Sequence, residues 1–344
     1  MRIAWLACTA LLALAARAEP ATGLREEVTF TEYGEPASSA EVLHRLLSPL
    51  AAAQVDRTLA ASHQALQPFS VDLAAERYAL YVPAKAPPQG YALLVFIPPW
   101  DAARVPPGWG PVLERTGTVF VTAARSGNDA DDLTRRAPLA LLAAVNVTRE
   151  YPIDPARIYV AGFSGGARVA LRIALAYPDL FRGALLNAGS DAIDAGPPSP
   201  AARERLAQFR ASSRLVYVTG ADDRVHLDMD ADSQESLRRW CMDDYAAEVT
   251  PKTGHEVAGG AALARALGDL GRRRPADSGR NAGCDARLQG QVAERLGRIA
   301  SLIAAGKPDK AQSELSDLDR HYGGLAAPRS LELEEALGWR IKSR

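Results

Sequence analysis

The sequence predicts an α/β protein with a doubly wound, mostly parallel sheet and a small helical appendage at its C-terminus. Three observations support this prediction: buried strand-like runs, helical patterns between them, and a purely helical pattern at the end of the chain. The strand-like runs are continuously apolar, as in strands that are covered on both faces. They span residues 93–97, 118–122, 157–161 and 214–218.

Helical spacing of apolar residues alternates with these runs, which is typical of right-handed strand–helix–strand units. The helical patterns span residues 132–149, 166–177, 232–245 and 261–270. Before the first run, Tyr78, Leu80 and Val82 stand at every second position. This alternation predicts an antiparallel edge strand. We therefore place one α/β domain over residues 71–274.

The tail changes character after a loop that we expect at 277–283. Helical patterns then cover 286–305, 308–321 and 330–342, with a turn at Gly306-Lys307-Pro308. We expect residues 284–344 to form a small bundle or a helix pair on the main domain. Residues 19–70 form a separate N-terminal segment that is partly helical.

The N-terminus predicts the compartment. Arg2 is followed by an apolar run from Ile3 to Ala16, and then by the small-residue pattern Ala16-Arg17-Ala18. These are the features of a secretory signal, which we assign to residues 1–18. We expect an exported protein, periplasmic or secreted.

Composition narrows the class of partners. The formal net charge is -1 and no basic stripe stands out, so we expect no nucleic-acid partner. Beyond the signal, no apolar run is long enough for a membrane helix, so we expect no integral membrane segment once the signal is removed. The chain has no metal-ligand constellation and no glycine-rich dinucleotide loop. We therefore expect no cofactor.

The motif Gly162-Phe163-Ser164-Gly165-Gly166 follows the third apolar run and precedes a helical pattern. In a strand-to-helix turn, small neighbours let a serine adopt a strained backbone and present its hydroxyl above the sheet. The helix N-terminus stabilises developing negative charge, and the next amide donates to an oxyanion. We interpret Ser164 as a nucleophile and Gly165 as an oxyanion-hole residue.

A serine nucleophile requires a base, and in this kind of site the chain order is serine, acid, histidine. That order excludes His44 and His63. His321 lies in the helical tail, and His226 lies only three residues after Asp223, too close to face it from another strand end. His255, in a loop between a short strand-like run and a helix, is the remaining base.

The acid that orients the base is expected after the strand-like run at 214–218. Thr219-Gly220-Ala221-Asp222-Asp223 offers two carboxylates there. Asp191 and Asp194, which follow another apolar stretch, are weaker alternatives. The residue pattern alone leaves Asp222 and Asp223 both open.

Four segments together resemble one branch of the α/β-hydrolases, that of polyhydroxybutyrate depolymerases and feruloyl esterases. They are Gly-Phe-Ser-Gly-Gly, Ala-Tyr-Pro-Asp-Leu-Phe-Arg-Gly at 176–183, Thr-Gly-Ala-Asp-Asp at 219–223 and Gly-His-Glu at 254–256. The resemblance covers about residues 75–270. It implies an α/β-hydrolase fold, esterase activity, and Asp223 as the acid, because the acid of this branch stands three residues after the glycine.

One departure affects the oxyanion hole. Many relatives carry His-Gly after the first buried strand, where this chain has Pro98-Pro99-Trp100-Asp101. Proline has no amide hydrogen to donate. The second donor must come from Trp100, from Asp101 or from another loop, and we favour the backbone N–H of Trp100.

After loss of the signal only Cys241 and Cys284 remain. Export favours a disulfide between them, and two unpaired thiols are the alternative. The whole sequence predicts a serine esterase that forms an acyl-enzyme on a small-molecule or polymeric ester. A peptidase, an acyltransferase or a non-catalytic binding module on the same scaffold are the alternatives.

Overall fold

A computed structural model describes residues 21–69, 71–194, 202–272 and 278–338. The predicted signal at 1–18 lies outside these ranges. The third tail helix, predicted over 330–342, ends earlier, at Ala336, and residues 339–342 lie outside the described ranges. The strands are β1 Gly23–Val28, β2 Tyr78–Val82, β3 Tyr91–Ile97, β4 Thr118–Ala123, β5 Ile153–Phe163, β6 Gly183–Asn187, β7 Arg214–Gly220 and β8 Tyr245–Thr250.

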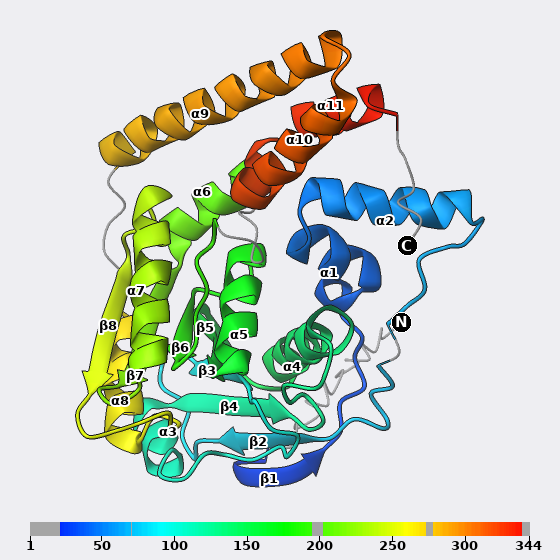
Figure 1. Cartoon of the computed structure of the whole chain (residues 1–344). Coiled ribbons are helices and arrows are strands. Elements are labelled where there is room, and N and C mark those ends of the chain that lie inside the picture. The colour runs from blue at the N-terminus through cyan, green and yellow to red at the C-terminus, as the bar shows by residue number, and fades with distance from the viewer. Residues whose placement is uncertain (1–20, 70, 195–201, 273–277, 339–344) are drawn as a thin grey trace, which may run out of the picture.

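Helices connect and flank the strands (Figure 1). They are α1 Ser39–Leu46, α2 Pro49–Ala61, α3 Gly110–Thr116, α4 Ala137–Glu150, α5 Gly165–Ala176, α6 Arg203–Ser212, α7 Arg224–Arg239, α8 Gly260–Leu270, α9 Ser278–Ala304, α10 Pro308–Tyr322 and α11 Arg329–Ala336, with the short turns η1 Glu35–Ala37, η2 Asp132–Arg136 and η3 Gly323–Leu325.

The eight strands form one sheet in the order β1-β2-β4-β3-β5-β6-β7-β8. The β1/β2 and β2/β4 pairs are antiparallel, and all pairs from β4 to β8 are parallel. Together with the sharp turn between β5 and α5 described below, this is the α/β-hydrolase fold. The predicted fold class is confirmed.

Alternate residues of the central strands point to opposite cores, as the pleat of a strand requires. Leu93, Val95 and Ile97 of β3 face the core under α4 and α5. Leu94 and Phe96 face the core under α3 and α8. Helices therefore cover both faces of the sheet, which is why these strands are apolar without alternation.

The prediction that Tyr78, Leu80 and Val82 form an edge strand is wrong in one respect. The strand is antiparallel, but β1 pairs with its outer side and takes the edge. Strand β1 has the sequence GLREEV, and most of its residues are exposed or half-buried. An exposed edge strand needs few apolar residues, so hydrophobic spacing did not reveal it.

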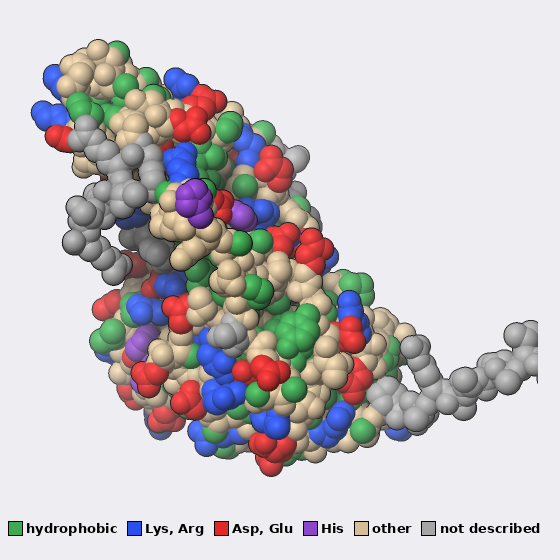
Figure 2. All heavy atoms as spheres, turned by 90° about the vertical axis from the view of Figure 1, so that its right-hand side faces the viewer, with side chains coloured by type: hydrophobic (Ala, Val, Ile, Leu, Met, Phe, Trp, Pro, Cys, Tyr) green, Lys and Arg blue, Asp and Glu red, His purple; other side chains and the backbone are tan. Residues whose placement is uncertain are grey.

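The C-terminal helices associate with α2, and together α2, α9, α10 and α11 are called the helical unit below (Figure 1). Its core is apolar and consists of Leu50, Val292, Ile299, Ala311, Leu315, Leu318, Ala326 and Leu333. Figure 2 shows the unit as a narrower lobe above the sheet domain, with acidic and basic side chains interspersed over both. The predicted tail thus includes a helix from the N-terminal segment.

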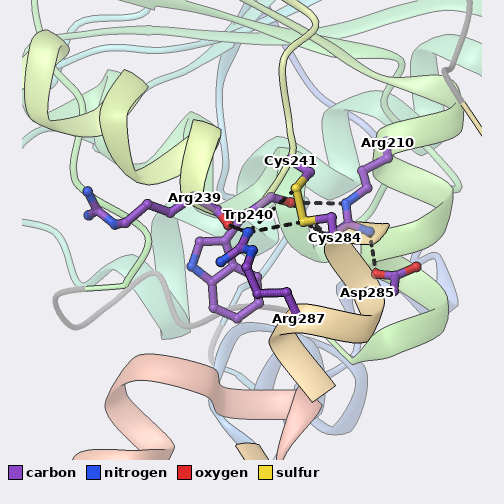
Figure 3. Close-up of a disulfide and its surroundings, with 7 residues drawn as sticks. All are labelled: Arg210, Arg239, Trp240, Cys241, Cys284, Asp285 and Arg287. Atoms are coloured by element: carbon purple, nitrogen blue, oxygen red, sulfur yellow. Dashed lines mark hydrogen bonds and ion pairs between the residues drawn. A yellow bond between two sulfur atoms is a disulfide. The ribbon is translucent and has the colours of Figure 1, made fainter. Parts of the chain in front are cut away.

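A disulfide joins Cys241, just after α7, to Cys284 in α9 (Figure 3). We expected Cys284 at the end of a loop covering 277–283, but α9 already begins at Ser278. Near the bridge, Arg210 donates to the Trp240 carbonyl at 2.8 Å and to Asp285 at 2.6 Å. The bridge and these bonds connect the helical unit to the sheet domain.

Candidate active site

The structure brings together the three side chains that the sequence assigns to a triad. His255 Nε2 lies 3.0 Å from Ser164 Oγ, and His255 Nδ1 lies 2.7 Å from Asp223 Oδ2. These distances form one continuous path of hydrogen bonds from hydroxyl to imidazole to carboxylate. Such a path lets the imidazole accept the serine proton while the carboxylate fixes its tautomer.

Ser164 occupies the turn between β5 and α5 with φ 55° and ψ -124°. A side chain at φ > 0 is strained, and such strain persists only where the surroundings impose it. Here an added Cβ on Gly166 would lie 1.9 Å from the Ile97 carbonyl oxygen, and one on Gly162 would lie 2.2 Å from the carbonyl carbon of Gly166. The two glycines let α5 start directly against the strands, which forces the turn.

Asp223 is the N-cap of α7 and follows the end of β7. It is 8% exposed, whereas Asp222 points to solvent. The two segments that carry acid and base are bonded to each other, since the Asp222 amide donates to the Thr253 carbonyl at 2.9 Å. This geometry distinguishes the two aspartates that the residue pattern left open.

The other candidates are engaged elsewhere. Asp191 pairs with Arg168 at 3.0 Å, and Asp194 pairs with Arg239 at 2.8 Å. His321 lies near Asp317 in the helical unit. Neither aspartate is bonded to His255, so among the described residues Asp223 is the acid that the structure brings to the base.

Two residues that sequence reasoning missed hold the site together. Asn187 stands at the end of β6. Its backbone carbonyl accepts a hydrogen bond from the Ser164 amide at 2.9 Å, and its side-chain oxygen accepts one from the Ala258 amide at 2.6 Å. Its side-chain amide donates to the Val218 carbonyl at 2.8 Å. A polar residue ending the apolar run Leu185-Leu186 was the available signal.

His226 is the second missed residue. We expected that His226, only three residues after Asp223, could hardly face it from another strand end, and we did not expect the contact that the structure shows. His226 Nδ1 lies 2.8 Å from Asp223 Oδ1, the oxygen that His255 does not contact. His226 contacts Asp223 from the first turn of α7 and not from the end of a strand.

The pKa of Asp223 reflects its two imidazole partners. Burial alone raises the pKa of this carboxyl, but the hydrogen bonds from His226 and His255 lower it, and the lowering prevails. The carboxylate is therefore ionised at neutral pH. A neighbouring acid behaves differently, because burial raises the pKa of Asp230 despite its bonds from Ser190 and Thr219.

Aromatic side chains form one wall beside the base. The Phe163 ring lies 4.9 Å from the His255 ring, and Trp100 lies 6.1 Å from Phe163. The Arg104 guanidinium stacks over Trp100 at 4.7 Å. His255 keeps 40% of its side chain exposed, so the base is reachable from solvent, whereas Phe163 behind it is buried.

The loop after β3 is fixed by the loop after β4. The Asn128 amide donates to the Pro99 carbonyl at 3.1 Å, and the Gly127 amide donates to the Asp101 side chain at 3.1 Å. The Asn128 side chain lies against Gly165, where an added Cβ would meet its Oδ1 at 2.3 Å. Residues 127 and 128 thus link the Trp100 loop to Gly165 at the start of α5, while the role of Trp100 as a donor stays a prediction.

Asp223, His226 and His255 each offer a ligand atom within 4.8 Å of the others, which is close enough for a metal site. The two imidazoles are stacked, with centroids 4.2 Å apart and planes inclined by 18°. Ring nitrogens bind a metal in the plane of the ring, and two stacked planes do not converge on one ion. Both Nδ1 atoms also point at carboxylate oxygens, which fits hydrogen bonding better than metal binding.

A cavity of about 580 Å³ lies elsewhere, between η1, α1 and α4. Apolar residues contribute most of its lining, among them Tyr33, Leu66, Phe69, Val71 and Leu142. None of the triad residues takes part in it.

No protein-family model and no curated protein matches the chain. Among solved structures it is similar to a ferulic acid esterase (16% identity, TM-score 0.44, over 57% of this chain and 92% of that one). It is also similar to an S-formylglutathione hydrolase from Staphylococcus aureus (13% identity, TM-score 0.45, over 57% of this chain and 93% of that one). A third similar structure is Porphyromonas gingivalis dipeptidyl peptidase 4 (18% identity, TM-score 0.41, over 57% of this chain and 33% of that one). None of these similarities identifies a substrate for this chain. Within the described ranges, no helix has the length and apolar character needed to cross a membrane.

Proposed function

We propose that this protein is a serine hydrolase that cleaves a carboxylic ester through an acyl-enzyme on Ser164. The observation that carries the proposal is the hydrogen-bonded path from Ser164 through His255 to Asp223. A serine hydroxyl is a weak nucleophile at neutral pH, and this arrangement activates it. Because Ser164 is only half-buried, a substrate carbonyl has access to the hydroxyl.

In the first half-reaction, His255 Nε2 takes the proton from Ser164 Oγ while Oγ bonds to the ester carbonyl carbon. The Gly165 amide, at the start of α5, donates to the resulting oxyanion. His255 then gives its proton to the alcohol oxygen, and the C–O bond breaks. The alcohol leaves and the acyl group stays on Ser164.

In the second half-reaction, His255 takes a proton from water, and the hydroxide oxygen bonds to the acyl carbon. The bond to Ser164 Oγ breaks, the hydroxyl regains its proton from His255, and the carboxylic acid leaves. Asp223 stabilises the imidazolium in both halves without becoming protonated itself.

The second oxyanion donor is part of the proposal. Pro98 and Pro99 have no amide hydrogen, so Trp100 is the first residue of this loop that has one. Its position is supported by the bonds that hold this loop to residues 127 and 128. We assign the backbone N–H of Trp100 to this role.

For the substrate we propose a small-molecule or polymeric ester, as in the polyhydroxybutyrate depolymerase and feruloyl esterase branch. The half-buried Trp100 ring, beside Phe163 and the base, supports an acyl group with apolar or aromatic character. We also propose export to the periplasm or the medium. The N-terminal pattern of residues 1–18 and the Cys241–Cys284 bridge support export.

A fluorophosphonate probe tests the nucleophile. We expect the wild-type protein to become labelled on Ser164 and the S164A variant to stay unlabelled. Folded wild-type protein that takes no label would contradict the proposal and favour a non-catalytic binding module.

Turnover assays then separate the substrate classes. We expect hydrolysis of p-nitrophenyl esters of graded acyl length and of feruloyl esters. Faster cleavage of peptides than of these esters would favour a peptidase. Acyl transfer to an added alcohol in preference to water would favour an acyltransferase.

A further inference from the structure

The catalytic carboxylate has two imidazole partners, one on each oxygen. His255 lies 2.7 Å from Oδ2, and His226 lies 2.8 Å from Oδ1. An ionised carboxylate can only accept hydrogen bonds, and both histidines contact Asp223 through Nδ1. Each histidine must therefore carry a proton on Nδ1. His255 Nε2 is then free to accept the proton of Ser164.

The local helix geometry makes the second contact specific. Asp223 is the N-cap of α7, and His226 is the third residue of its first turn. An N-cap side chain is directed at the backbone amide of this position, and the Asp223 carboxylate lies 3.5 Å from the His226 amide nitrogen. The His226 side chain therefore meets the carboxylate that caps its own helix.

The second imidazole also lies against the first. The His226 and His255 rings stack at 4.2 Å, and Phe163 lies 4.9 Å from the His255 ring. His226 is anchored in a helix, whereas His255 lies in a loop. The helix thus fixes the direction from which His226 approaches the carboxylate.

We propose that His226 is a positioning residue of the site. By donating from Nδ1 to Asp223 Oδ1, it fixes the rotation of the carboxylate so that Oδ2 faces His255. The kinetic consequence rests on the proposed hydrolase function, while the structural consequence does not. The lowered pKa of Asp223 agrees with this role, since the bond from His226 opposes the effect of burial.

Two substitutions separate the hydrogen bond from the stacked ring. In H226N the side-chain amide donates from near the position of Nδ1 but has no ring. In H226F the ring remains and the donor is lost. His44 lies on α1, where its side chain contacts Asp56 of α2, far from the triad in the chain. The variant H44F is therefore the control outside the site.

We expect kcat to fall about tenfold to a hundredfold in H226F, the size of one hydrogen bond to a charged group. KM should change little, because the contact acts on the base rather than on bound substrate. H226N and H44F should keep kcat within about threefold of the wild type. Equal losses in H226N and H226F, or wild-type kcat in H226F, would overturn the proposal.

Proton NMR of the resting protein tests the same contact without substrate. The hydrogen-bonded Nδ1 proton of His255 should resonate at low field in the wild type and in H226N, and should shift or broaden in H226F. An unchanged resonance in H226F would contradict the positioning role. If the wild type takes no fluorophosphonate label but the resonance responds as expected, the hydrolase proposal fails while the positioning role is retained.

Discussion

The triad edge, which is the end of the sheet where β5, β6 and β7 carry Ser164, Asn187 and Asp223, differs from the helical unit in the forces that hold it together. Both regions are built from segments far apart in the chain. At the triad edge, directional hydrogen bonds fix each polar group, as between Asn187, Ser164 and Ala258. In the helical unit, apolar packing around Leu315 and Ile299 joins α2 to the C-terminal helices. We therefore expect changes at the edge to affect turnover, and changes in the unit to affect stability.

The largest expected effect is that of S164A on turnover. Loss of a triad member costs about a million-fold in kcat, because the remaining groups act as a unit with it. The melting temperature should stay near that of the wild type, since the serine hydroxyl contributes no core contact. Esterase assays and thermal melts of the purified variant measure both quantities. A variant that kept more than about a tenth of the activity would break the assignment.

A smaller effect is expected from the choice between adjacent aspartates. D223N should lower kcat about ten-thousand-fold, because an amide at this position holds the wrong imidazole tautomer. D222N is the matched control, one residue away and exposed. We expect it to keep nearly full activity. Loss of activity in D222N with a normal D223N would show that the acid has been misassigned.

The sequence could predict that the three proposed triad residues come together, because their positions depend on chain topology. Parallel strands end at one edge, so a nucleophile after β5 and an acid after β7 had to meet there. The base followed from chain order. Asn187 and His226 were not predicted, because each acts through a hydrogen bond whose partner is set by three-dimensional packing.

The fold was predicted where burial dictates composition and was missed where it does not. Strands β3, β4, β5 and β7 are buried on both faces, which requires continuous apolar runs. The exposed edge strand β1 has no such requirement. The first turns of α9 contain Gly279 and Gly283, which indicate a loop by propensity, yet the chain is helical there.

The disulfide tests the stability side of the comparison. Closing a loop of 43 residues stabilises the fold by about 4 kcal/mol in the chain-entropy model. We expect reduction, or the C241S/C284S variant, to lower the melting temperature. Esterase activity at low temperature should survive, because neither sulfur lies in the triad. Denaturant titration with and without reductant measures the change in stability. A loss of esterase activity on reduction, while the protein is still folded, would contradict the separation of the two regions.

The smallest expected effect concerns a buried acid of the helical unit. Asp319 accepts a hydrogen bond from Ser48, the N-cap of α2, and burial raises its pKa. A carboxyl with a raised pKa keeps its proton in the folded state after the unfolded chain has lost it. Its contribution to stability is therefore complete below the unfolded pKa of about 3.9, and it declines as the pH rises toward the folded pKa.

The D319N variant should remove this decline, because the amide oxygen still accepts from Ser48 and does not titrate. We expect the free energy of unfolding of D319N to rise relative to that of the wild type as the pH increases from about 4 toward neutral. Denaturant titrations across this range measure the difference, with activity assays alongside. D230N is the comparison at the triad edge, since burial also raises the pKa of Asp230, which bonds Ser190 and Thr219 near the site. If D319N lowered kcat, the two regions would be coupled, and the separation of stability from turnover would be wrong.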